Sequence, residues 1–193
     1  MLSVIIWTVD GGLDMAVILR DMLESDIENY VKWFSVSDGN IDWDKYDAPW
    51  ETVDTDEETE RREWREYYEH IKTLPKERVR WKFEIEADGE HIGWVSAYDD
   101  LEYIENPEKI PAIGIDIPER RHRGKGCGYE ALTKFMEYLK EHGNKSLFTQ
   151  TWSGNTPMLK LAEKLGFKEY VRVKDLREVD GKKYDALTLR IDF

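Results

Sequence analysis

The chain has 193 residues, 40% of them hydrophobic, which is enough for one domain with a substantial core and excludes a disordered chain. Its formal net charge of −13 disfavours binding to nucleic acid phosphates and favours cationic partners, with acidity that serves only solubility as the alternative. The single cysteine, Cys127, excludes an internal disulfide, and no stretch reaches the length of a membrane span. We therefore expect a cytoplasmic protein that binds neither nucleic acid nor membranes.

The first residues differ from a secretory signal. The apolar run over residues 4–9 is short, no basic residue precedes it, and Asp10 and Asp14 follow closely. Met15 begins a segment that has the character of a natural start. We interpret residues 1–14 as an N-terminal extension of a single domain over residues 15–193, with Met1 as the alternative start.

Hydrophobic periodicity, capping residues and turn residues predict the secondary structure. In chain order, the predicted elements are a strand over 16–23, a helix that follows Asp26, a charged helix over 54–72, a hairpin of strands 80–86 and 91–98, a strand over 112–117, a helix over 129–141, a strand over 146–152, a helix between Asn155 and Gly166, and a hairpin of strands 171–179 and 184–191. Hairpins followed by alternating strands and helices indicate an α/β (α+β) domain with a mixed sheet.

A basic, glycine-rich loop joins the strand over 112–117 to the next helix. Its residues are Arg123, Gly124, Lys125, Gly126, Cys127 and Gly128. Glycines allow tight turns and close approach of the backbone to a ligand, and the free amides at a helix start favour an anion. Arg120 and Arg121 add further positive charge. The loop therefore predicts a phosphate or pyrophosphate site.

Two other phosphate loops are weaker interpretations. The spacing of a P-loop is absent. Residues 126–131 fit the dinucleotide pattern G-x-G-x-x-A, but residues 151–153 lack the acidic residue that binds the ribose, and the unit comes late in the chain. An oxidoreductase on a different fold is thus the less favoured alternative.

Two motifs in order resemble the GNAT superfamily of acetyltransferases. The loop over 123–128 matches the signature Arg/Gln-x-x-Gly-x-Gly/Ala, and Asn155 opens a helix that closes on Glu-Lys-Leu-Gly-Phe at 163–167. The resemblance covers roughly residues 16–193 and is strongest over 112–168. It implies a GNAT fold, with a central mixed, mostly antiparallel sheet in which the parallel strands 112–117 and 146–152 splay apart between flanking helices.

The resemblance also implies a co-substrate, acetyl-CoA, and no metal. The pyrophosphate would lie on the backbone amides between Arg123 and Tyr129, and the backbone of Ile115, Asp116 and Ile117 would pair with the pantetheine arm. An amide near Ile117 would polarise the thioester carbonyl. Asn155 would bind the pantetheine amides, cap its helix, or do both. The expected reaction is direct transfer of an acetyl group to a primary amine.

The transfer needs a base that takes a proton from the amine. Asp116 is our candidate because it interrupts an apolar strand beside the cofactor, where a cationic substrate would compensate its charge. The alternative is an edge carboxylate paired with Arg120 or Arg123. Other candidate carboxylates are Glu84, Glu86, Asp99 and Asp100.

The usual tyrosine acid of the family is missing, because Ala162 occupies its position. The alternatives are that water protonates the thiolate or that the thiolate leaves unprotonated. Cys127 is interpreted as a small residue in a tight turn rather than a nucleophile, and the four histidines have no metal-ligand spacing.

The acceptor is expected near aromatic and acidic residues of the N-terminal half. Trp33, Trp43, Tyr46 and Trp50 suit a cation through cation–π contacts, with core packing as the alternative role. Residues 91–98 and 115–116 loosely resemble acetyltransferases of aminoglycosides, polyamines and ribosomal-protein N-termini. We therefore expect a small-molecule amine or a peptide N-terminus as partner, and a homodimer is compatible with the sequence. A non-catalytic acetyl-CoA sensor is the alternative function.

Overall fold

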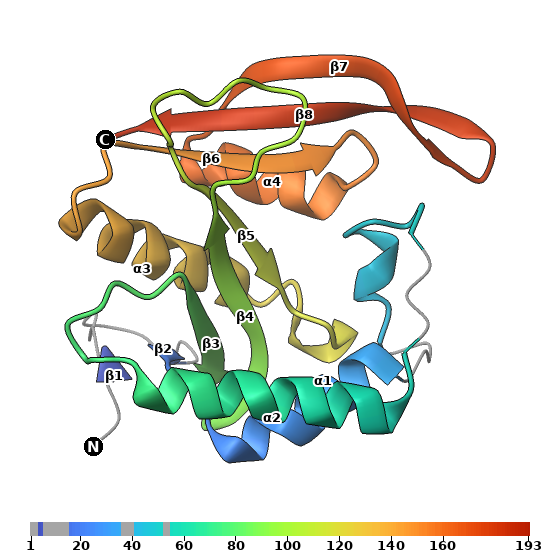
Figure 1. The fold of residues 1–193 in the computed structure, drawn as a ribbon. Coiled ribbons are helices and arrows are strands. Elements are labelled where there is room, and N and C mark those ends of the chain that lie inside the picture. Colours follow the sequence, from blue (N-terminus) through green and yellow to red (C-terminus); the bar gives the residue numbers. More distant parts are fainter. Residues whose placement is uncertain (1–3, 6–15, 36–40, 52–54) are drawn as a thin grey trace.

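The computed structural model describes residues 4–5, 16–35, 41–51 and 55–193 (Figure 1). Within these residues, eight strands form one sheet in the order β1-β2-β3-β4-β5-β6-β8-β7. The strands are β1 (Val4–Ile5), β2 (Val17–Arg20), β3 (Lys82–Ala87), β4 (Glu90–Tyr98), β5 (Ala112–Asp116), β6 (Ser146–Trp152), β7 (Lys168–Val179) and β8 (Lys182–Asp192). All neighbouring pairs are antiparallel except β5 and β6, which confirms the mixed, mostly antiparallel sheet.

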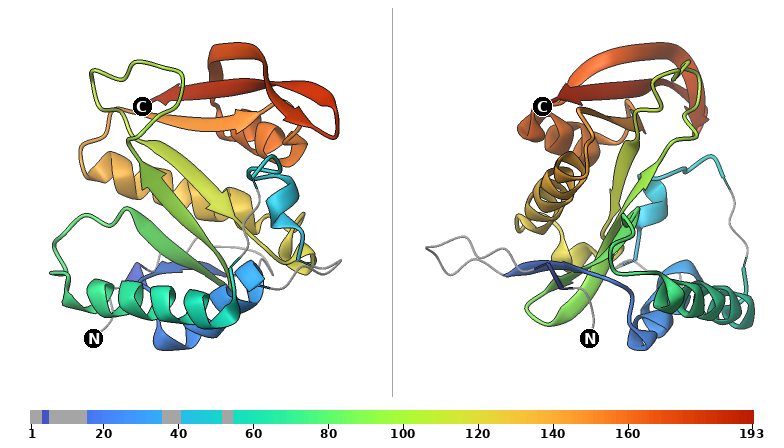
Figure 2. Two further views of the ribbon diagram at one scale, coloured as in Figure 1. Left: turned by 45° about the vertical axis from the view of Figure 1, so that its right-hand side comes forward. Right: turned by 60° about the vertical axis from the view of Figure 1, so that its left-hand side comes forward.

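Helices cover both faces of the sheet (Figure 2). Four α-helices are described: α1 (Ile27–Ser35), α2 (Glu57–Thr73), α3 (Cys127–Glu141) and α4 (Thr156–Leu165). Three short 3-10 turns accompany them: η1 (Glu24–Asp26), η2 (Trp43–Lys45) and η3 (Arg120–His122). The main core lies between the sheet and α3 with α4, and a second, aromatic core lies between the sheet and α1 with α2. In the described part of the chain, no helix has the length and apolarity needed to cross a bilayer.

The helix predicted over 129–141 is present as α3, and one apolar stripe runs along it. The members of the stripe are all buried in the main core: Ala131, Leu132, Phe135, Met136 and Leu139. The helix begins at Cys127, two residues before the predicted start at Tyr129, because Gly126 takes a left-handed conformation at its N-cap. The helix therefore starts within the glycine loop itself.

Several predicted boundaries in the N-terminal half are wrong by a few residues. The first strand ends at Arg20, because Asp26 accepts hydrogen bonds from the amide of Leu23 and from Arg20 and so closes a turn before α1. The charged helix begins after Asp56, whose carboxylate caps it by accepting from the amides of Glu58 and Thr59.

Most of the predicted N-terminal extension lies outside the described residues. Strand β1 pairs with β2, with Val4 opposite Arg20, but residues 1–3 and 6–15 are not described. The interpretation of residues 1–14, and of Met15 as the start, therefore stays a prediction.

The parallel strands β5 and β6 touch only at one end. Their recorded pairing is between Ala112 and Phe148, next to a hydrogen bond from the amide of Phe148 to the carbonyl of Pro111 at 2.9 Å. Beyond this point β5 and β6 diverge. On its other edge, the whole length of β5 pairs with β4, and β6 pairs with β8. The splay that the family resemblance implied is thus present, and one edge of β5 is left facing a gap.

Candidate active site

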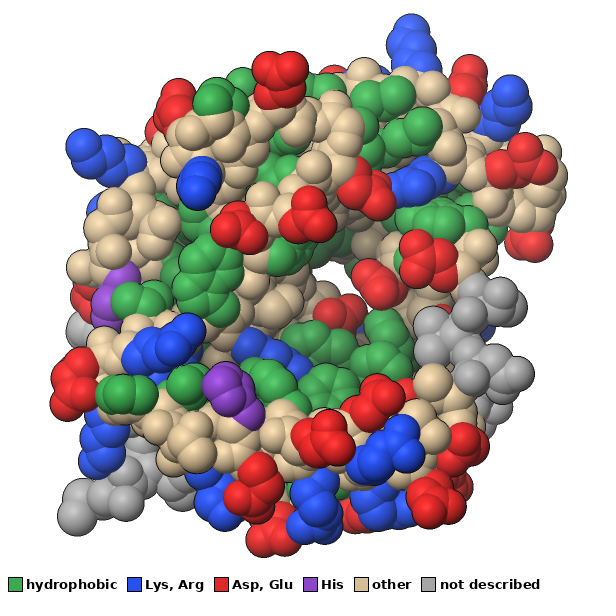
Figure 3. Space-filling view, in the orientation of Figure 1, with side chains coloured by type: hydrophobic (Ala, Val, Ile, Leu, Met, Phe, Trp, Pro, Cys, Tyr) green, Lys and Arg blue, Asp and Glu red, His purple; other side chains and the backbone are tan. Residues whose placement is uncertain are grey.

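A cavity of about 960 Å³ occupies the gap between β5 and β6. Figure 3 shows a hollow at the centre of the molecule with acidic side chains around it. Its lining comes from residues 43–47, strands β4 to β6, the loop before α3 and the start of α4. The predicted site residues that line it are Trp43, Tyr46, Ile115, Asp116, Ile117, Arg123, Gly124, Gly126, Gly128, Tyr129 and Asn155.

The amides before α3 form one end of the cavity. Gly124 and Gly126 have φ angles of +72° and +94°, a left-handed backbone that glycine adopts without steric cost. The first helical hydrogen bond of α3 runs from the amide of Glu130 to the carbonyl of Gly126, at 3.1 Å. The amides before Glu130 therefore lie outside the helical ladder, where they and the helix dipole favour an anion. This end of the cavity suits a pyrophosphate.

Arg123 has a different position from the one expected of a free phosphate ligand. Its guanidinium donates to Asp42 at 2.6 Å and to the carbonyl of Ile117 at 2.6 Å. Arg120 pairs with the same carboxylate of Asp42, so neither arginine pairs with Asp116. Arg123 thus stabilises the loop from within, while one side of it still lines the cavity.

Arg121 is also neutralised by the protein, because it pairs with Glu119 and Glu90. Lys125 is exposed and, within the described residues, forms no ion pair. The expectation that all the basic residues add free charge at the loop is therefore wrong for the arginines. Acidic residues that are distant in the sequence fold against them.

Two threonines of β6 that line the cavity have buried hydroxyls. They are Thr149 and Thr151, and within the described residues the Oγ1 atoms of both have no hydrogen-bond partner. A buried hydroxyl without a partner costs free energy, so such atoms commonly mark the place of a ligand. Both lie on β6, across the cavity from β5, and a pantetheine arm would run between these two strands. The sequence analysis missed both residues, since threonine in a strand carries no distinctive signal.

Asn155 has the cap role that was one of its two predicted roles. Its Oδ1 accepts from the amide of Met158 at 3.1 Å, which caps α4. Its Nδ2 donates to the carbonyl of Tyr46 at 2.9 Å, and the indole of Trp152 donates to the same carbonyl at 2.9 Å. The segment around Tyr46 is therefore attached to the cavity wall by the residue expected to bind pantetheine.

Asp116 is the last residue of β5 and lines the cavity. Burial raises the pKa of its carboxyl to about 7, with a contribution from the charge of Asp47, while Lys82 and Arg123 oppose the rise. Within the described residues the carboxylate of Asp116 forms no ion pair or hydrogen bond, because Arg120 and Arg123 are held by Asp42. A carboxyl with a pKa near neutrality has the property required of a general base.

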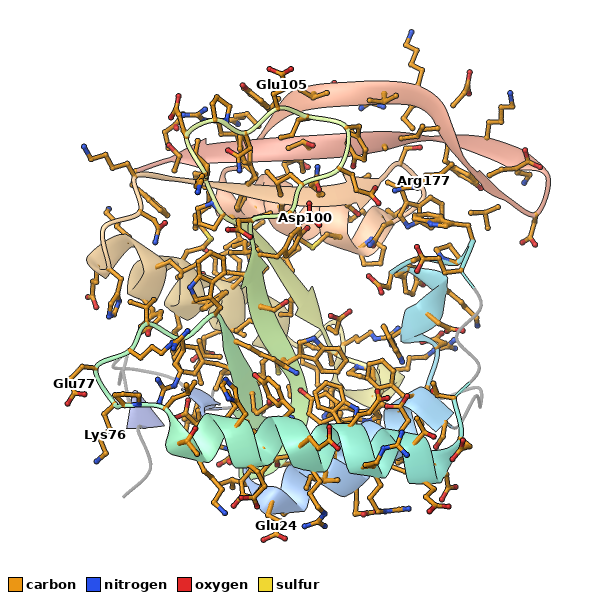
Figure 4. The ribbon with its side chains drawn as sticks, in the orientation of Figure 1. Glu24, Lys76, Glu77, Asp100, Glu105 and Arg177 are labelled. Carbon is orange, nitrogen blue, oxygen red and sulfur yellow. The ribbon has the colours of Figure 1, made fainter. Side chains whose placement is uncertain are left out.

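The other candidate carboxylates are less well placed. Glu84 is buried and accepts from Tyr30 at 2.6 Å, and its Oε2 lies 2.9 Å from Nε2 of His91. Glu86 pairs with Arg20 at 2.7 Å. Asp99 and Asp100 are exposed in the loop after β4, where Figure 4 labels Asp100. None of the four lines the cavity as described.

The predicted acceptor residues divide into two groups. Trp43 and Tyr46 line the cavity. Trp33 is only 2% exposed and packs in the aromatic core, so the structure favours its alternative role in packing. Trp50 contacts Trp152 edge to face at 5.8 Å between ring centroids, and Arg177 lies 4.4 Å from the Trp50 ring (Figure 4). Trp33 and Trp50 are thus absent from the described lining.

Cys127, considered as a nucleophile, and Ala162, at the position of the family's tyrosine acid, are both buried. Cys127 is buried at the start of α3, and burial raises the pKa of its thiol, which disfavours a reactive thiolate. Ala162 is fully buried in α4. Among the described residues, no group of three or more histidine, cysteine, aspartate or glutamate side chains could hold a metal ion.

Comparisons with known proteins agree with this geometry. Residues 16–168 match the family model of the acetyltransferase (GNAT) domain. The chain is 37% identical over 81 residues to YwnH of Bacillus subtilis (strain 168), named as a candidate phosphinothricin acetyltransferase; the match covers 42% of this chain and 49% of that protein. The chain thus spans about half the length of this relative.

Two solved structures share the fold. Ribosomal-protein-alanine N-acetyltransferase from Brucella melitensis has a TM-score of 0.62 at 19% identity, covering 91% of this chain and 99% of that one. RimJ of Mycobacterium smegmatis, solved in complex with CoA-disulfide, has a TM-score of 0.66 at 18% identity, covering 92% and 82%. The family match extends from β2 to the end of the helix motif at residue 167 and includes the whole glycine loop. The chain therefore belongs to the GNAT acetyltransferase family.

Proposed function

We propose that this domain transfers the acetyl group of acetyl-CoA to a primary amine, with Asp116 as the general base. The observation that carries the proposal is that one cavity holds the amide cradle before α3, two unpartnered threonine hydroxyls and a carboxyl whose pKa is about 7. A cytoplasmic location, where acetyl-CoA is available, is part of the proposal.

The cofactor half of the cavity runs from the loop over 123–129 along β5 and β6. The amides of Gly124, Gly126 and Gly128 would hold the pyrophosphate, with Lys125 as an exposed cation nearby. The free edge of β5 over 115–117 and the hydroxyls on β6 would bind the pantetheine arm. Acetyl-CoA supplies an acetyl group activated as a thioester.

Asp116 acts on the acceptor amine. Amines are mostly protonated at neutral pH, and only the neutral form is a nucleophile. The ionised carboxylate attracts the incoming ammonium and takes its proton, which leaves a neutral amine next to the cofactor strand. Because the pKa of Asp116 is about 7, the carboxylate is about half ionised at neutral pH and is a stronger base than an exposed aspartate. The neutral amine would attack the acetyl carbonyl, the new C–N bond would replace the C–S bond, and the nitrogen would lose its second proton to water. The CoA thiolate would leave without a tyrosine acid, since Ala162 fills the family position.

The acceptor half of the cavity favours a cationic amine. Asp47 and Asp116 both line it, and desolvation raises the pKa of Asp47 with a contribution from Glu51. Trp43 and Tyr46 supply aromatic faces beside them, which suit a cation. An aminoglycoside, a polyamine or a protein N-terminus fits this description. We propose no nucleic acid or membrane partner, and a homodimer remains compatible with it.

The function is tested in two steps. First, acetyl-CoA should raise the unfolding temperature of the protein, while NAD and NADP should not. Second, release of free CoA thiol should be measured with an aminoglycoside, spermidine, an N-terminal peptide and phosphinothricin. We expect release with a cationic amine. A thermal shift without thiol release from any acceptor would favour the sensor function, and no shift with acetyl-CoA would refute the proposal.

Replacing both unpartnered hydroxyls should raise the stability of the free protein and lower its affinity for acetyl-CoA. In the double variant Thr149→Val with Thr151→Val, two buried polar atoms without partners are removed, so the free energy of unfolding of the free protein should rise by about 1 kcal/mol. Affinity for acetyl-CoA should fall by about ten-fold, since hydrogen bonds to the ligand are lost. Urea unfolding and calorimetric titration measure the two effects. Unchanged affinity would exclude the hydroxyls from the cofactor site.

A further inference from the structure

The ammonium group of Lys82 lies in a box of four aromatic rings. Its Nζ is 4.2 Å from the ring centroid of Trp64, 4.5 Å from Tyr30, 5.0 Å from Tyr67 and 5.3 Å from Trp94. We call these four rings the aromatic box. They come from α1, α2 and β4, so the tertiary fold assembles the box around one side chain of β3. Cation–π attraction fixes the position of this charge.

Lys82 lacks a carboxylate of its own. Within the described residues it forms no ion pair, whereas the cavity cation Arg123 is bound to Asp42 at 2.6 Å. Burial lowers the pKa of the Lys82 ammonium, and the charges of Glu84 and Asp116 oppose that change. The positive charge is therefore enclosed by rings that attract it but carry no net charge. The charges that act on it come from the carboxylates of Glu84, two positions along β3, and of Asp116.

The sheet register places Lys82 and Asp116 on the same face. Glu84, Trp94 and Asp116 are paired across β3, β4 and β5, and the adjacent row is Lys82, Ser96 and Gly114. Residues directly opposite and two apart along a strand share one face of a sheet. The row of Lys82 continues on β4 and β5 with a serine and a glycine, which are small. In the adjacent row, Trp94 is paired with Asp116 and is also a ring of the aromatic box, so the Lys82 ammonium and Asp116 are neighbours of the same indole.

The other charged groups around Asp116 do not replace this cation. Asp47, from segment 41–51, is negative and raises the pKa of Asp116. Glu84, two strands away in the same row, is hydrogen-bonded by Tyr30 and contacts His91. The loop before α3 contributes Arg123, whose guanidinium is shared among Asp42 and the carbonyls of Ile117 and Pro118.

We propose that Lys82, fixed in the aromatic box, is a positioning residue for the acetyl transfer: it supplies a positive charge at a fixed position that stabilises the Asp116 carboxylate in the cavity. The proposal rests on the function proposed for Asp116. Among the described residues, neither Lys82 nor any ring of the aromatic box lines the cavity, so Lys82 acts on Asp116 through its charge and not by contact with the acceptor.

The test compares three variants. Lys82→Met keeps a long side chain that packs well against aromatic rings but removes the charge. Lys82→Arg keeps the charge and the cation–π contacts. Lys72→Met is the matched control, because Lys72 also lies over a ring, that of Tyr68 at 4.9 Å, but is exposed and paired with Glu69. Both an activity profile and a direct titration are measured for each.

In the activity profile, the acid limb of kcat/KM against pH should move upward by about one pH unit in Lys82→Met, because a nearby opposite charge lowers a carboxyl pKa by at least that amount. At pH values below the acid limb, kcat/KM of Lys82→Met should be about ten-fold lower than that of the parent, and at high pH the two values should be equal. Lys82→Arg and Lys72→Met should keep the parent limb. A uniform loss at every pH would indicate a merely structural role and overturn the proposal.

The direct titration follows the Asp116 carboxyl by ¹³C NMR of aspartate-labelled protein, with the resonance assigned by its loss in Asp116→Asn. The titration midpoint should move upward in Lys82→Met and stay in place in Lys82→Arg. An unchanged midpoint in Lys82→Met would overturn the role of Lys82, even if the enzyme is active. Absence of thiol release from the parent would instead refute the proposed function, and the NMR result would still decide whether the two charges are coupled.

Discussion

Replacing Asp116 with asparagine should lower kcat/KM for the acceptor by about 100-fold or more while leaving the affinity for acetyl-CoA within two-fold of the parent. The size follows from the contribution typical of a positioned general base. Asparagine keeps the shape of the side chain but cannot take a proton. The affinity should be unaffected because the expected contacts of residue 116 with the cofactor are made by its backbone. Thiol release and calorimetric titration measure the two quantities.

The matched control for this variant is Asp99→Asn, which neutralises an exposed carboxylate in the loop after β4. Its turnover should be close to that of the parent. A stability measurement checks that Asp116→Asn is folded. The pKa of the Asp116 carboxyl is about 7 in the folded protein, above that of an unfolded aspartate. Its ionisation therefore lowers the free energy of unfolding progressively as the pH rises from the unfolded pKa towards 7, and the loss is complete only above pH 7. The variant should therefore be more stable than the parent at pH 8 and differ little at pH 4. Turnover within a few-fold of the parent would remove Asp116 from the mechanism.

Replacing Gly126 with valine should lower the affinity for acetyl-CoA by about 100-fold. Gly126 has a φ of +94°, which is strongly disfavoured for a β-branched residue. The backbone at the start of α3 would have to rotate, and the amides that face the cavity would no longer converge on an anion. Calorimetric titration with acetyl-CoA measures the loss. The variant should also release little thiol at cofactor concentrations that saturate the parent.

The other end of the same helix supplies the control. Gly143 follows α3, has a φ of +95° and, like Gly126, has open space where a Cβ would be added. Gly143→Val therefore imposes the same backbone strain far from the cavity. Both variants should lose similar stability, and only Gly126→Val should lose affinity. Equal affinities in the two variants would contradict the assignment of the loop as the pyrophosphate site.

Local patterns in the chain predicted well the backbone turn before α3 and the two ends of α4. Three alternate glycines before an amphipathic helix require a backbone turn followed by free amides, and the structure has both at Gly126 and Cys127. The helix start at Asn155 and its end at Gly166 were equally clear, because a cap residue and a left-handed glycine act within one turn of the chain. Asp116 was identified because a carboxylate in an apolar strand is uncommon.

The acceptor half could not be predicted in the same way. Aromatic residues near each other in the sequence have different fates: Trp33 is buried in the core while Trp43 lines the cavity. The arginines at the loop were expected to add local positive charge, but Asp42 lies 81 positions before Arg123 and neutralises it. Such pairings depend on which segments meet in space, and charge patterns along the chain carry no information about that.

By itself, the amino-acid sequence determined that this chain forms a mixed sheet and a helix that follows a glycine-rich loop, because glycine, proline and cap residues act on the backbone within a few residues. Only the tertiary structure decided the charge state around the site. The rings around Lys82, the partner of Arg123 and the exposure of Asp116 all arise from contacts between distant segments. Burial and the proximity of other charges set a carboxyl pKa, and both exist only in the folded molecule.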